Sequence, residues 1–276
     1  MNGALRLDAP AKLNLSLTVV GRREDGYHLL DSHVVLLELA DRLLLLPGCS
    51  GLRVEGDRSR DVPLDETNLA WRGLVAGLGE EPQIACLALE KRVPVGAGLG
   101  GGSSDAAAAR RLGRAWRGLP EGAADEADLA GLAVIGADVP FFAACVPAAR
   151  ITGVGERIES LPAESAHVVL VHPPYGLSTA AVFAELRAAD WGTASNDLLA
   201  PAMRVRPELE DLFTLVREAG GDPRLSGAGS TVFTLTGDPE RATAVAARLG
   251  DKKIRATLSR TRDAAASIER ISEEES

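Results

Sequence analysis

The chain has 276 residues, of which 46% are hydrophobic and 25% are charged, and its formal net charge at pH 7 is −9. This length and composition exclude a disordered or fibrous protein and indicate a globular chain large enough to form two lobes around a cleft. The acidic excess argues against a general surface for nucleic acid or an anionic membrane, so an anionic substrate would need locally placed cations or backbone amides.

Strand-like patterns dominate the beginning of the chain. Apolar and β-branched residues predict strands at 11–20, 34–38 and 42–46, and the polar, glycine-bearing segment 21–26 interrupts them. We therefore expect an antiparallel hairpin or meander. Residues 68–78 have the apolar spacing of a helix, with Thr67 or Asn68 available as its cap, and a strand is expected at 84–89.

A glycine-rich segment leads into the alanine-rich stretch 103–116, which has a high helix propensity. A further helix is expected at 125–135, ended by Gly136, and the chain then turns through residues 137–140.

A second lobe is expected from residue 150 onward. Strand patterns at 168–172, 231–236 and 253–257 alternate there with helix patterns at 180–188, 207–219 and 240–249. The sequence therefore predicts an α+β fold of two domains, 1–149 and 150–276.

The glycine-rich segment, residues 94–104, is the strongest candidate for a ligand site. Glycine lacks the Cβ atom that keeps backbone amides away from a polyphosphate. The segment runs into a predicted helix, whose unpaired first-turn amides and positive dipole end favour an anion. The residues expected to hold a nucleotide are Pro94, Val95, Gly96, Ala97, Gly98, Leu99, Gly100, Gly101, Gly102, Ser103 and Ser104. The two serines add hydroxyl donors or magnesium contacts.

Three other interpretations compete with this one. A flexible connector is possible, but connectors rarely enter an alanine-rich helix directly. Gly96, Gly98 and Gly101 fit the dinucleotide fingerprint G-x-G-x-x-G, yet the polar segment 118–128 follows the helix where that fold needs a second strand. The P-loop pattern is absent because no lysine follows the glycines, which leaves Lys12 and magnesium as the candidate cations.

The cysteines and histidines suggest neither a disulfide nor a metal site. Cys49, Cys86 and Cys145 are odd in number and widely separated, which favours unpaired thiols in a reducing compartment. The four histidines show no metal-ligand spacing. Because no run approaches the roughly 18 apolar residues of a membrane span and no signal sequence is evident, we expect a cytoplasmic protein.

Two further features have a structural and a functional interpretation each. The turn at 226–229, with the sequence SGAG, is expected either to contact a substrate phosphate or simply to connect two elements. Trp71, Trp116 and Trp191 are expected to pack in or beside the core, with no role in the site.

Five segments, read together and in order, resemble the GHMP kinase superfamily. They are APAKLNLSL (9–17), GRREDGYHLL (21–30), PVGAGLGGGSSDAA (94–107), GADVPFF (136–142) and LSGAGSTVF (225–233). The motifs REDGYH and GADVPFF are similar to those of the members that act on a cytidine-diphosphate-linked methylerythritol. The resemblance implies a two-lobe α+β kinase with its active site in the cleft between the lobes.

The implied reaction is ATP-dependent phosphorylation of the 2-hydroxyl of that cytidylyl compound, a step in the non-mevalonate route to isoprenoid precursors. Magnesium is expected to accompany ATP. The expected partner is a small molecule, with no nucleic acid and no membrane, and the oligomeric state is left open.

The resemblance also implies roles for individual residues. Those matching its motifs are the catalytic pair Lys12 and Asp138, the cytosine-holding Tyr27 and His28, the substrate-facing Asn14, Thr179 and Phe183, and Asn68 near the nucleotide base. Phe183 is similar to the aromatic residue on the other face of the cytosine.

The chemistry of these residue types is consistent with the implied roles. An aspartate close to a lysine stays ionised, as a proton acceptor must, and an aromatic ring can stack on a pyrimidine. Without the resemblance, Asp138 is better explained as a cap or turn residue, Lys12 as a solvated strand residue, and Tyr27 and His28 as hairpin packing.

Two other functions remain open at this point. One is a superfamily kinase acting on homoserine, mevalonate or a sugar, against which the REDGYH motif argues. The other is a nucleotide-binding regulatory protein without transfer activity, which would be expected to lack the pair formed by Lys12 and Asp138.

Overall fold

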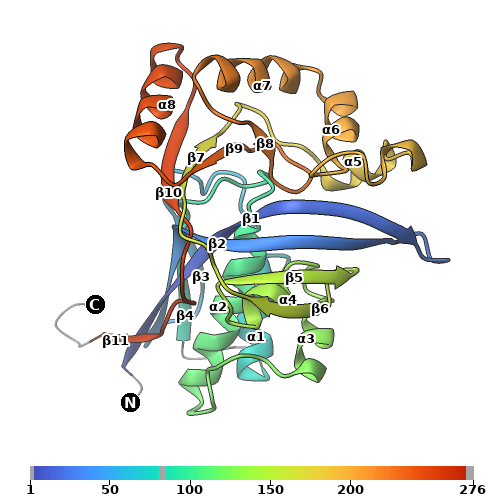
Figure 1. Ribbon diagram of the computed structural model, residues 1–276. Helices are drawn as coiled ribbons and strands as arrows, with labels where there is room; N and C mark the ends of the chain where they lie inside the picture. The colour runs from blue at the N-terminus through green and yellow to red at the C-terminus, as the bar shows by residue number, and fades with distance from the viewer. Residues whose placement is uncertain (1–2, 81, 83–84, 272–276) are drawn as a thin grey trace.

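Two long antiparallel strands, β1 (Ala4–Arg22) and β2 (His28–Pro47), run through the middle of the molecule (Figure 1). The computed structural model describes residues 3–80, 82 and 85–271. The predicted hairpin is confirmed, but the strands expected at 34–38 and 42–46 form one continuous β2. The polar residue Asp41 does not end the strand, because its carboxylate accepts the backbone amides of Arg92 and Val93.

β1 and β2 belong to a seven-stranded sheet with the order β11-β1-β2-β4-β3, to which β5 and β6 add beside β2. The five further strands are β3 (Gly51–Glu55), β4 (Ala85–Glu90), β5 (Ala148–Gly153), β6 (Arg157–Leu161) and β11 (Glu269–Ile271). β4 is the strand expected at 84–89, whose first residue lies outside the described residues. β3, β5, β6 and β11 were not predicted, because they are short and β3, β6 and β11 are largely exposed.

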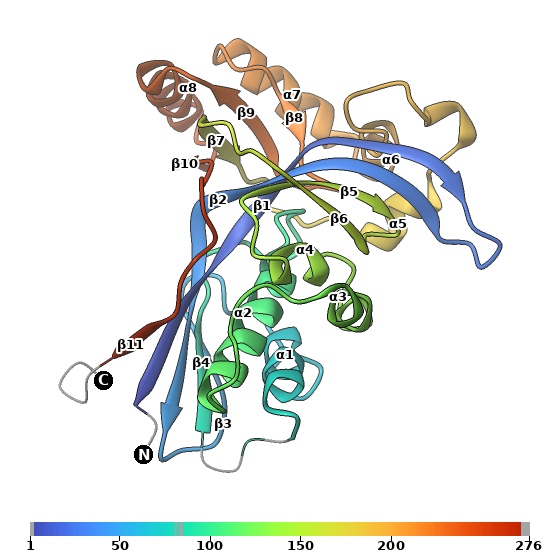
Figure 2. The ribbon, with the colours of Figure 1, turned by 60° about the horizontal axis from the view of Figure 1, so that its bottom comes forward.

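Four helices pack below this sheet (Figure 2). They are α1 (Leu69–Leu78), α2 (Gly101–Trp116), α3 (Glu126–Leu132) and α4 (Val139–Ala143). The helix at 68–78 is confirmed with Asn68 as its cap, and α2 begins two residues before the expected 103. α3 is shorter than predicted. The turn expected at 137–140 is confirmed at 137–138 only, and α4 takes the other two residues, because Pro140 is compatible with the first turn of a helix.

A second, four-stranded sheet has the order β10-β7-β9-β8. Its strands are β7 (His167–Val171), β8 (Arg224–Leu225), β9 (Val232–Thr236) and β10 (Ala256–Arg260). The helices around it are α5 (Thr179–Ala184), η1 (Ala188–Asp190), α6 (Leu199–Val205), α7 (Glu208–Glu218) and α8 (Pro239–Asp251). The helix expected at 180–188 is divided into α5 and η1, α6 and β8 were not predicted, and β10 begins later than residue 253.

The side chains of β7 alternate between its two faces, which explains how the two sheets pack together. Val168 and Leu170 pack with Leu13 and Leu37 of the first sheet, whereas Val169 and its neighbours on the opposite face pack against the helices above. Since successive side chains of a strand point to opposite faces, β7 has both faces buried. The central layers are therefore helices, sheet, sheet and helices (Figure 1).

The expected boundary at residues 149 and 150 falls within β5, which pairs with β2 in the first sheet. β6 also belongs to that sheet, and β11 returns to it at the end of the described chain. We propose that the division between the lobes lies between β6 and β7.

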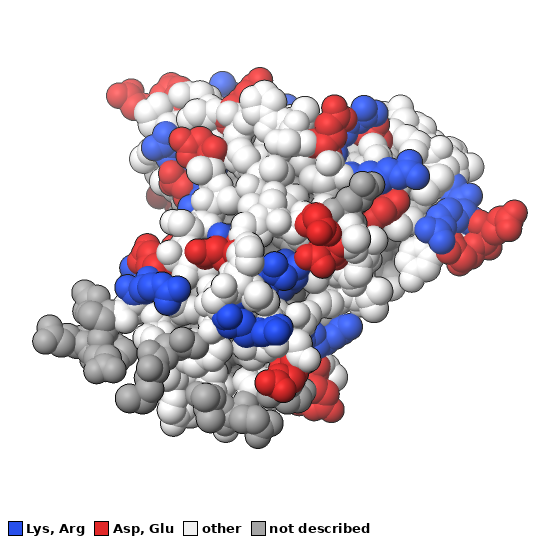
Figure 3. Space-filling view, turned by 90° about the horizontal axis from the view of Figure 1, so that it is seen from below, with Lys and Arg blue, Asp and Glu red and all other residues white. Residues whose placement is uncertain are grey.

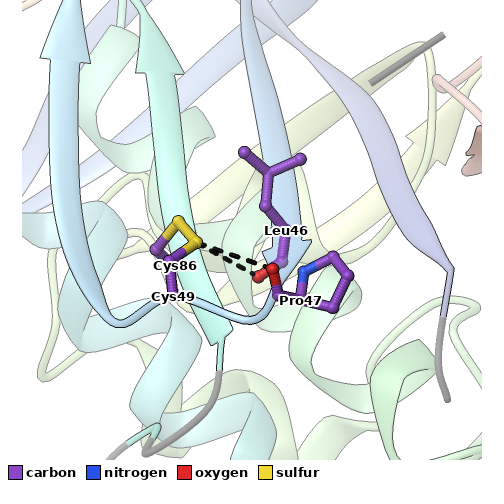
Figure 4. Close-up of a disulfide and its surroundings, with 4 residues drawn as sticks. All are labelled: Leu46, Pro47, Cys49 and Cys86. Atoms are coloured by element: carbon purple, nitrogen blue, oxygen red, sulfur yellow. Dashed lines mark hydrogen bonds between the residues drawn. A yellow bond between two sulfur atoms is a disulfide. The ribbon is translucent and has the colours of Figure 1, made fainter. Parts of the chain in front are cut away.

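A disulfide joins Cys49 to Cys86, so the expectation of three unpaired thiols was wrong (Figure 4). Cys49 lies in the turn after β2, two residues before Gly51, and the register of β3 on β4 places Gly51 opposite Cys86. The pairing brings their Cα atoms to 5.3 Å, a separation typical of disulfides. Only Cys145 is a free cysteine among the described residues.

Charged residues of both signs are interspersed on the face seen from below (Figure 3). The acidic excess therefore does not form a single negative field there. Within residues 3–80, 82 and 85–271, no helix has the length and apolar character needed to cross a membrane.

Candidate active site

A pocket of about 440 Å³ lies at the N-terminal end of α2. Ten of the eleven residues from Pro94 to Ser104 line it, together with the predicted site residues Asn68, Asp138 and Thr179. Only Ser104 is not part of the lining; it is buried, and its hydroxyl has no hydrogen-bond partner among the described residues. The structure thus gathers residues far apart in the sequence around the glycine-rich loop.

The loop takes a conformation that requires glycine at Gly98 and Gly100. Both have a positive φ, and a Cβ atom at Gly98 would lie 2.2 Å from the carbonyl oxygen of Ser226. Ser226 also donates its hydroxyl to the Gly98 carbonyl, and the Thr231 amide donates to Ala97. The turn at 226–229, in the second lobe, therefore holds the loop in its conformation. This supports the interpretation that the turn has a structural role.

The start of α2 supplies the anion-binding groups. Gly100 is its N-cap in the left-handed conformation and offers no side chain to the first-turn amides. Gly101, Gly102 and Ser103 follow in the lining of the pocket. Their amides precede the first hydrogen bond within the helix and lie at the positive end of its dipole, an arrangement that favours phosphate.

Lys12 reaches this site because of an irregularity in the pairing of β1 and β2 between Pro10 and Lys12. Before it, Leu7 and Ala9 pack with α1 and α2; after it, Ala11 and Leu13 pack with the second sheet. Such an irregularity shifts the alternation of side chains by one residue, so the side chains after it point to the opposite face. Lys12 consequently faces the side on which α2 and α4 lie.

Lys12 and Asp138 form the pair expected from the sequence. Lys12 is 4% exposed, and its Nζ lies 3.5 Å from Asp138 Oδ2 and 2.5 Å from Asn14 Oδ1. Asn14 in turn donates to Ser32 Oγ, so its carbonyl oxygen is oriented toward the lysine. Asp138 is the N-cap of α4, yet its carboxylate makes no capping hydrogen bond, which leaves it available in the pocket.

Sequence reasoning missed a buried ionic cluster beside the pocket, formed by Lys91, Asp41 and Asp105. Lys91 Nζ lies 2.7 Å from Asp105 Oδ2 and also contacts Asp41. Burial alone would lower the pKa of Lys91, but the two carboxylates raise it above its usual value. Burial also raises the pKa of Asp105 to about 8, Lys91 opposes this rise and Asp41 adds to it.

The signal for this cluster was present in the sequence as one charged residue inside an apolar strand and another directly after one. Asp41 interrupts the leucine-rich β2, and Lys91 directly follows β4. Charged residues are rarely fully buried unless they are paired, so each suggests a partner. The sequence alone could not identify that partner, because Asp41 and Lys91 are 50 residues apart.

The residues expected to hold a pyrimidine lie around the turn that joins β1 to β2. His28 stacks on Phe183 with 5.4 Å between ring centroids and 23° between planes. Tyr27 is 67% exposed at the adjacent position. Burial, followed by the charge of Arg22, lowers the pKa of His28, so its ring is held in the neutral form.

Trp191 was expected to have no place in the site, and the structure differs on this point. Its ring lies edge-on to His28, with 6.3 Å between centroids and 88° between planes. His28 is therefore contacted by two aromatic rings of the second lobe. The irregular segment around Trp191 shows no periodicity from which this contact could be predicted.

Comparison with known proteins agrees with this geometry. The GHMP kinases N terminal domain matches residues 68–145, and the GHMP kinases C terminal domain matches residues 181–255. The 4-diphosphocytidyl-2-C-methyl-D-erythritol kinase of Paracoccus denitrificans is 39% identical over 87% of this chain and 90% of its own length. The enzyme of that name from Thermus thermophilus is 37% identical over 85% and 88%.

Solved structures extend the comparison. A crystal structure of 4-(cytidine 5'-diphospho)-2C-methyl-D-erythritol kinase superposes with a TM-score of 0.74, at 35% identity over 92% of this chain and 98% of that one. Homoserine kinase from Cytophaga hutchinsonii gives 0.67 at 17% identity, over 98% of each chain, and shares the fold alone. With the glycine-rich loop at the start of α2 and a lysine–aspartate pair beside it, the chain belongs to the 4-diphosphocytidyl-2-C-methyl-D-erythritol kinases of the GHMP kinase family.

Proposed function

We propose that the protein transfers the γ-phosphoryl group of ATP to the 2-hydroxyl of 4-diphosphocytidyl-2-C-methyl-D-erythritol, a step toward isoprenoid precursors. The single observation that carries this proposal is the placement of Asp138 and Lys12, 3.5 Å apart, at the pocket formed by the glycine-rich loop. A regulatory protein without transfer activity has no need of such a pair.

The reaction forms a bond between the acceptor oxygen and the γ-phosphorus and breaks the bond from that phosphorus to the β,γ-bridging oxygen. Asp138 accepts the hydroxyl proton, and Lys12, 3.5 Å away, orients its carboxylate. Lys12 also stabilises negative charge on the transferring group. The amides at the start of α2 hold the phosphates in place, and positioning of this kind supplies most of the catalysis in phosphoryl transfer.

Magnesium is proposed to accompany ATP, and the donor set fits an ion bound mainly through phosphate oxygens. Among the described residues, no three His, Cys, Asp or Glu side chains gather into a metal site. Among the oxygens of the lining, the Ser103 hydroxyl and the Asp138 carboxylate are proposed to face the ion, and so few protein ligands suit a cation that keeps several of its waters. When bound, the ion neutralises charge on the phosphates.

The cytidine end of the substrate is proposed to lie at Tyr27, His28 and Phe183. Neutral His28 offers one ring nitrogen as donor and the other as acceptor for the edge of a base, and Tyr27 offers an exposed face for stacking. His28 and Phe183 are in direct contact, so the base would stack on an outer face of this pair rather than between its rings. Asn14 and Thr179 are proposed to face the substrate between the two ends.

The cytoplasmic location expected from the sequence stays a prediction. The disulfide between Cys49 and Cys86 removes the argument that was based on unpaired thiols.

The test is ADP release from the purified protein with magnesium-ATP, measured separately with the cytidylyl substrate, homoserine, mevalonate and galactose. We expect turnover with the cytidylyl compound alone. Turnover with another acceptor would keep the kinase activity and overturn the assignment of the cytidine end. An absence of ADP release with every acceptor, in a protein that still binds ATP, would favour the regulatory alternative.

A further inference from the structure

Three basic side chains without an acidic partner among the described residues lie at the junction of the two lobes, outside the catalytic pair. Arg58 and His172 line three adjoining hollows, the largest of about 430 Å³, and Arg255 lines two of them. Arg58 comes from the segment after β3, His172 directly follows β7, and Arg255 directly precedes β10. Arg58 thus belongs to the first lobe, and His172 and Arg255 belong to the second.

Arg58 and Arg255 have no counter-ion in the part of the chain that the structure describes. Neither side chain forms an ion pair or a hydrogen bond with another described residue, whereas Arg92, which lines one of the same hollows, is paired with Glu90. Burial and then the charge of Arg255 lower the pKa of Arg58, and Asp57 offsets them only in part. Like charges held together without a partner are unfavourable unless an anion joins them.

His172 completes the group. It is 7% exposed, and burial, followed by Arg58 and Arg255, lowers its pKa to about 4. Its ring is therefore neutral at pH 7, and one nitrogen is available as a donor. The Nδ1 atom lies 3.4 Å from Thr231 Oγ1, and Nε2 has no partner among the described residues.

We propose that Arg58, His172 and Arg255, none of which lines the nucleotide pocket, form a second anion site beside it that binds a phosphate or diphosphate group. Guanidinium groups bind phosphate oxygens through two parallel hydrogen bonds, and a neutral imidazole adds a third donor. Because the three residues come from both lobes, the bound anion holds the lobes together at this point.

The site is connected to the glycine-rich loop. His172 contacts Thr231, and the Thr231 amide donates to the Ala97 carbonyl at 3.1 Å. One of the hollows is also lined by Pro94, Val95 and Ala97. An anion on His172 is therefore expected to change the affinity of the loop for ATP as well.

Carboxylates restrict where the anion lies. Glu208 and Asp211 of α7 line the largest hollow but neither of the other two, so an anion is favoured toward the two hollows that lack them. The charged groups that line the hollows with His172 are Asp57, Arg58, Arg60, Asp61, Glu90, Lys91, Arg92, Glu208, Asp211, Lys253 and Arg255.

The test follows the His172 ring by NMR as the pH is varied, with and without inorganic phosphate. A non-hydrolysable ATP analogue fills the nucleotide pocket throughout. The His172→Asn variant identifies the signal, and His167 on the same strand serves as the internal reference. We expect phosphate to move the midpoint of the His172 titration upward by about one pH unit or more, as a nearby opposite charge does, while that of His167 stays in place.

Matched variants locate the site. Arg58→Gln and Arg255→Gln are each expected to weaken phosphate binding about tenfold, or about 1.4 kcal/mol. Arg260→Gln removes the same charge from the exposed end of β10 and is expected to change nothing. Arg255 is exposed, so its variant is expected to fold even if a buried His172 variant does not, which unfolding curves will show.

A parallel titration with diphosphate distinguishes the two ligands. Binding of diphosphate at least about tenfold tighter than phosphate would assign the site to a diphosphate group, and equal binding would assign it to a single phosphate. An unchanged His172 midpoint with both ligands would overturn the proposal. So would an equal loss of binding in Arg260→Gln, because it would show a general effect of net charge.

Discussion

The substitution Asp105→Asn tests the electrostatics of the buried cluster beside the nucleotide pocket. Asp105 is 2% exposed and shares one ammonium group, that of Lys91, with Asp41. If both carboxylates are ionised, the cluster carries one uncompensated negative charge in a buried place. Burial therefore raises the pKa of Asp105 to about 8, and it holds a proton at neutral pH. Asparagine has nearly the same shape as this protonated form.

The sign of the effect follows from the difference in bound protons. Between the ordinary value of 3.8 and about 8, folded Asp105 binds a proton that the unfolded chain releases. The free energy of unfolding of the parent protein therefore falls as the pH rises through this range, by at most about 1.4 kcal/mol per pH unit for one proton. The asparagine variant lacks this pH-dependent contribution to the free energy of unfolding. Its stability relative to the parent should rise from pH 5 to pH 8 and then level off.

The assay is guanidinium unfolding of both proteins at unit steps from pH 5 to pH 9. Titrating groups remote from Asp105 are common to the two proteins, so they cancel in the difference of the two unfolding free energies. Asp61→Asn, which changes an exposed carboxylate of the same pocket, is the control and should give a flat difference. A flat difference for Asp105→Asn would refute the reasoning, because it would mean that Asp105 is ionised throughout.

Three further predictions concern the site. Asp138→Asn should reduce kcat at least about 100-fold while ATP still binds, as measured by ADP release and nucleotide titration, and near-normal turnover would remove Asp138 from the mechanism. Gly98→Ala should raise the KM for ATP and lower stability by about 1–3 kcal/mol, because a Cβ atom there meets a carbonyl oxygen at 2.2 Å; an unchanged melting temperature would contradict this. Tyr27→Ala should raise the KM of the cytidylyl substrate about tenfold and leave that of ATP unchanged, and equal weakening of both would reject its place at the cytidine end.

Elements with a strong local pattern could be predicted from the sequence. The helix capped by Asn68 was found because its apolar spacing and its cap are both local. α2 was found because alanines follow the glycines, and α7 and α8 because their apolar residues recur at helical spacing. In each case the information lies within about 15 residues of the element.

Features that depend on the pairing of distant segments could not be predicted. The disulfide requires the register of β3 on β4, which brings Cys49 beside Cys86. The cluster around Lys91 requires the middle of β2 and the end of β4 to meet at the side of α2. Trp191 reaches His28 only because the second lobe packs over the hairpin. None of these contacts leaves a periodic trace in the sequence.

The position of the proposed catalytic pair depends both on local sequence motifs and on the pairing of distant strands. The motifs identify Lys12 and Asp138, but only the irregular pairing in β1 turns the lysine toward α4. The backbone of Lys12 also donates to the Leu99 carbonyl at 2.9 Å, which ties the lysine to the glycine-rich loop. A displacement of that loop would therefore move the lysine and the amides at the start of α2 together. Because phosphoryl transfer depends mainly on alignment, this link between strand and loop keeps the acceptor side and the ATP side of the reaction in register.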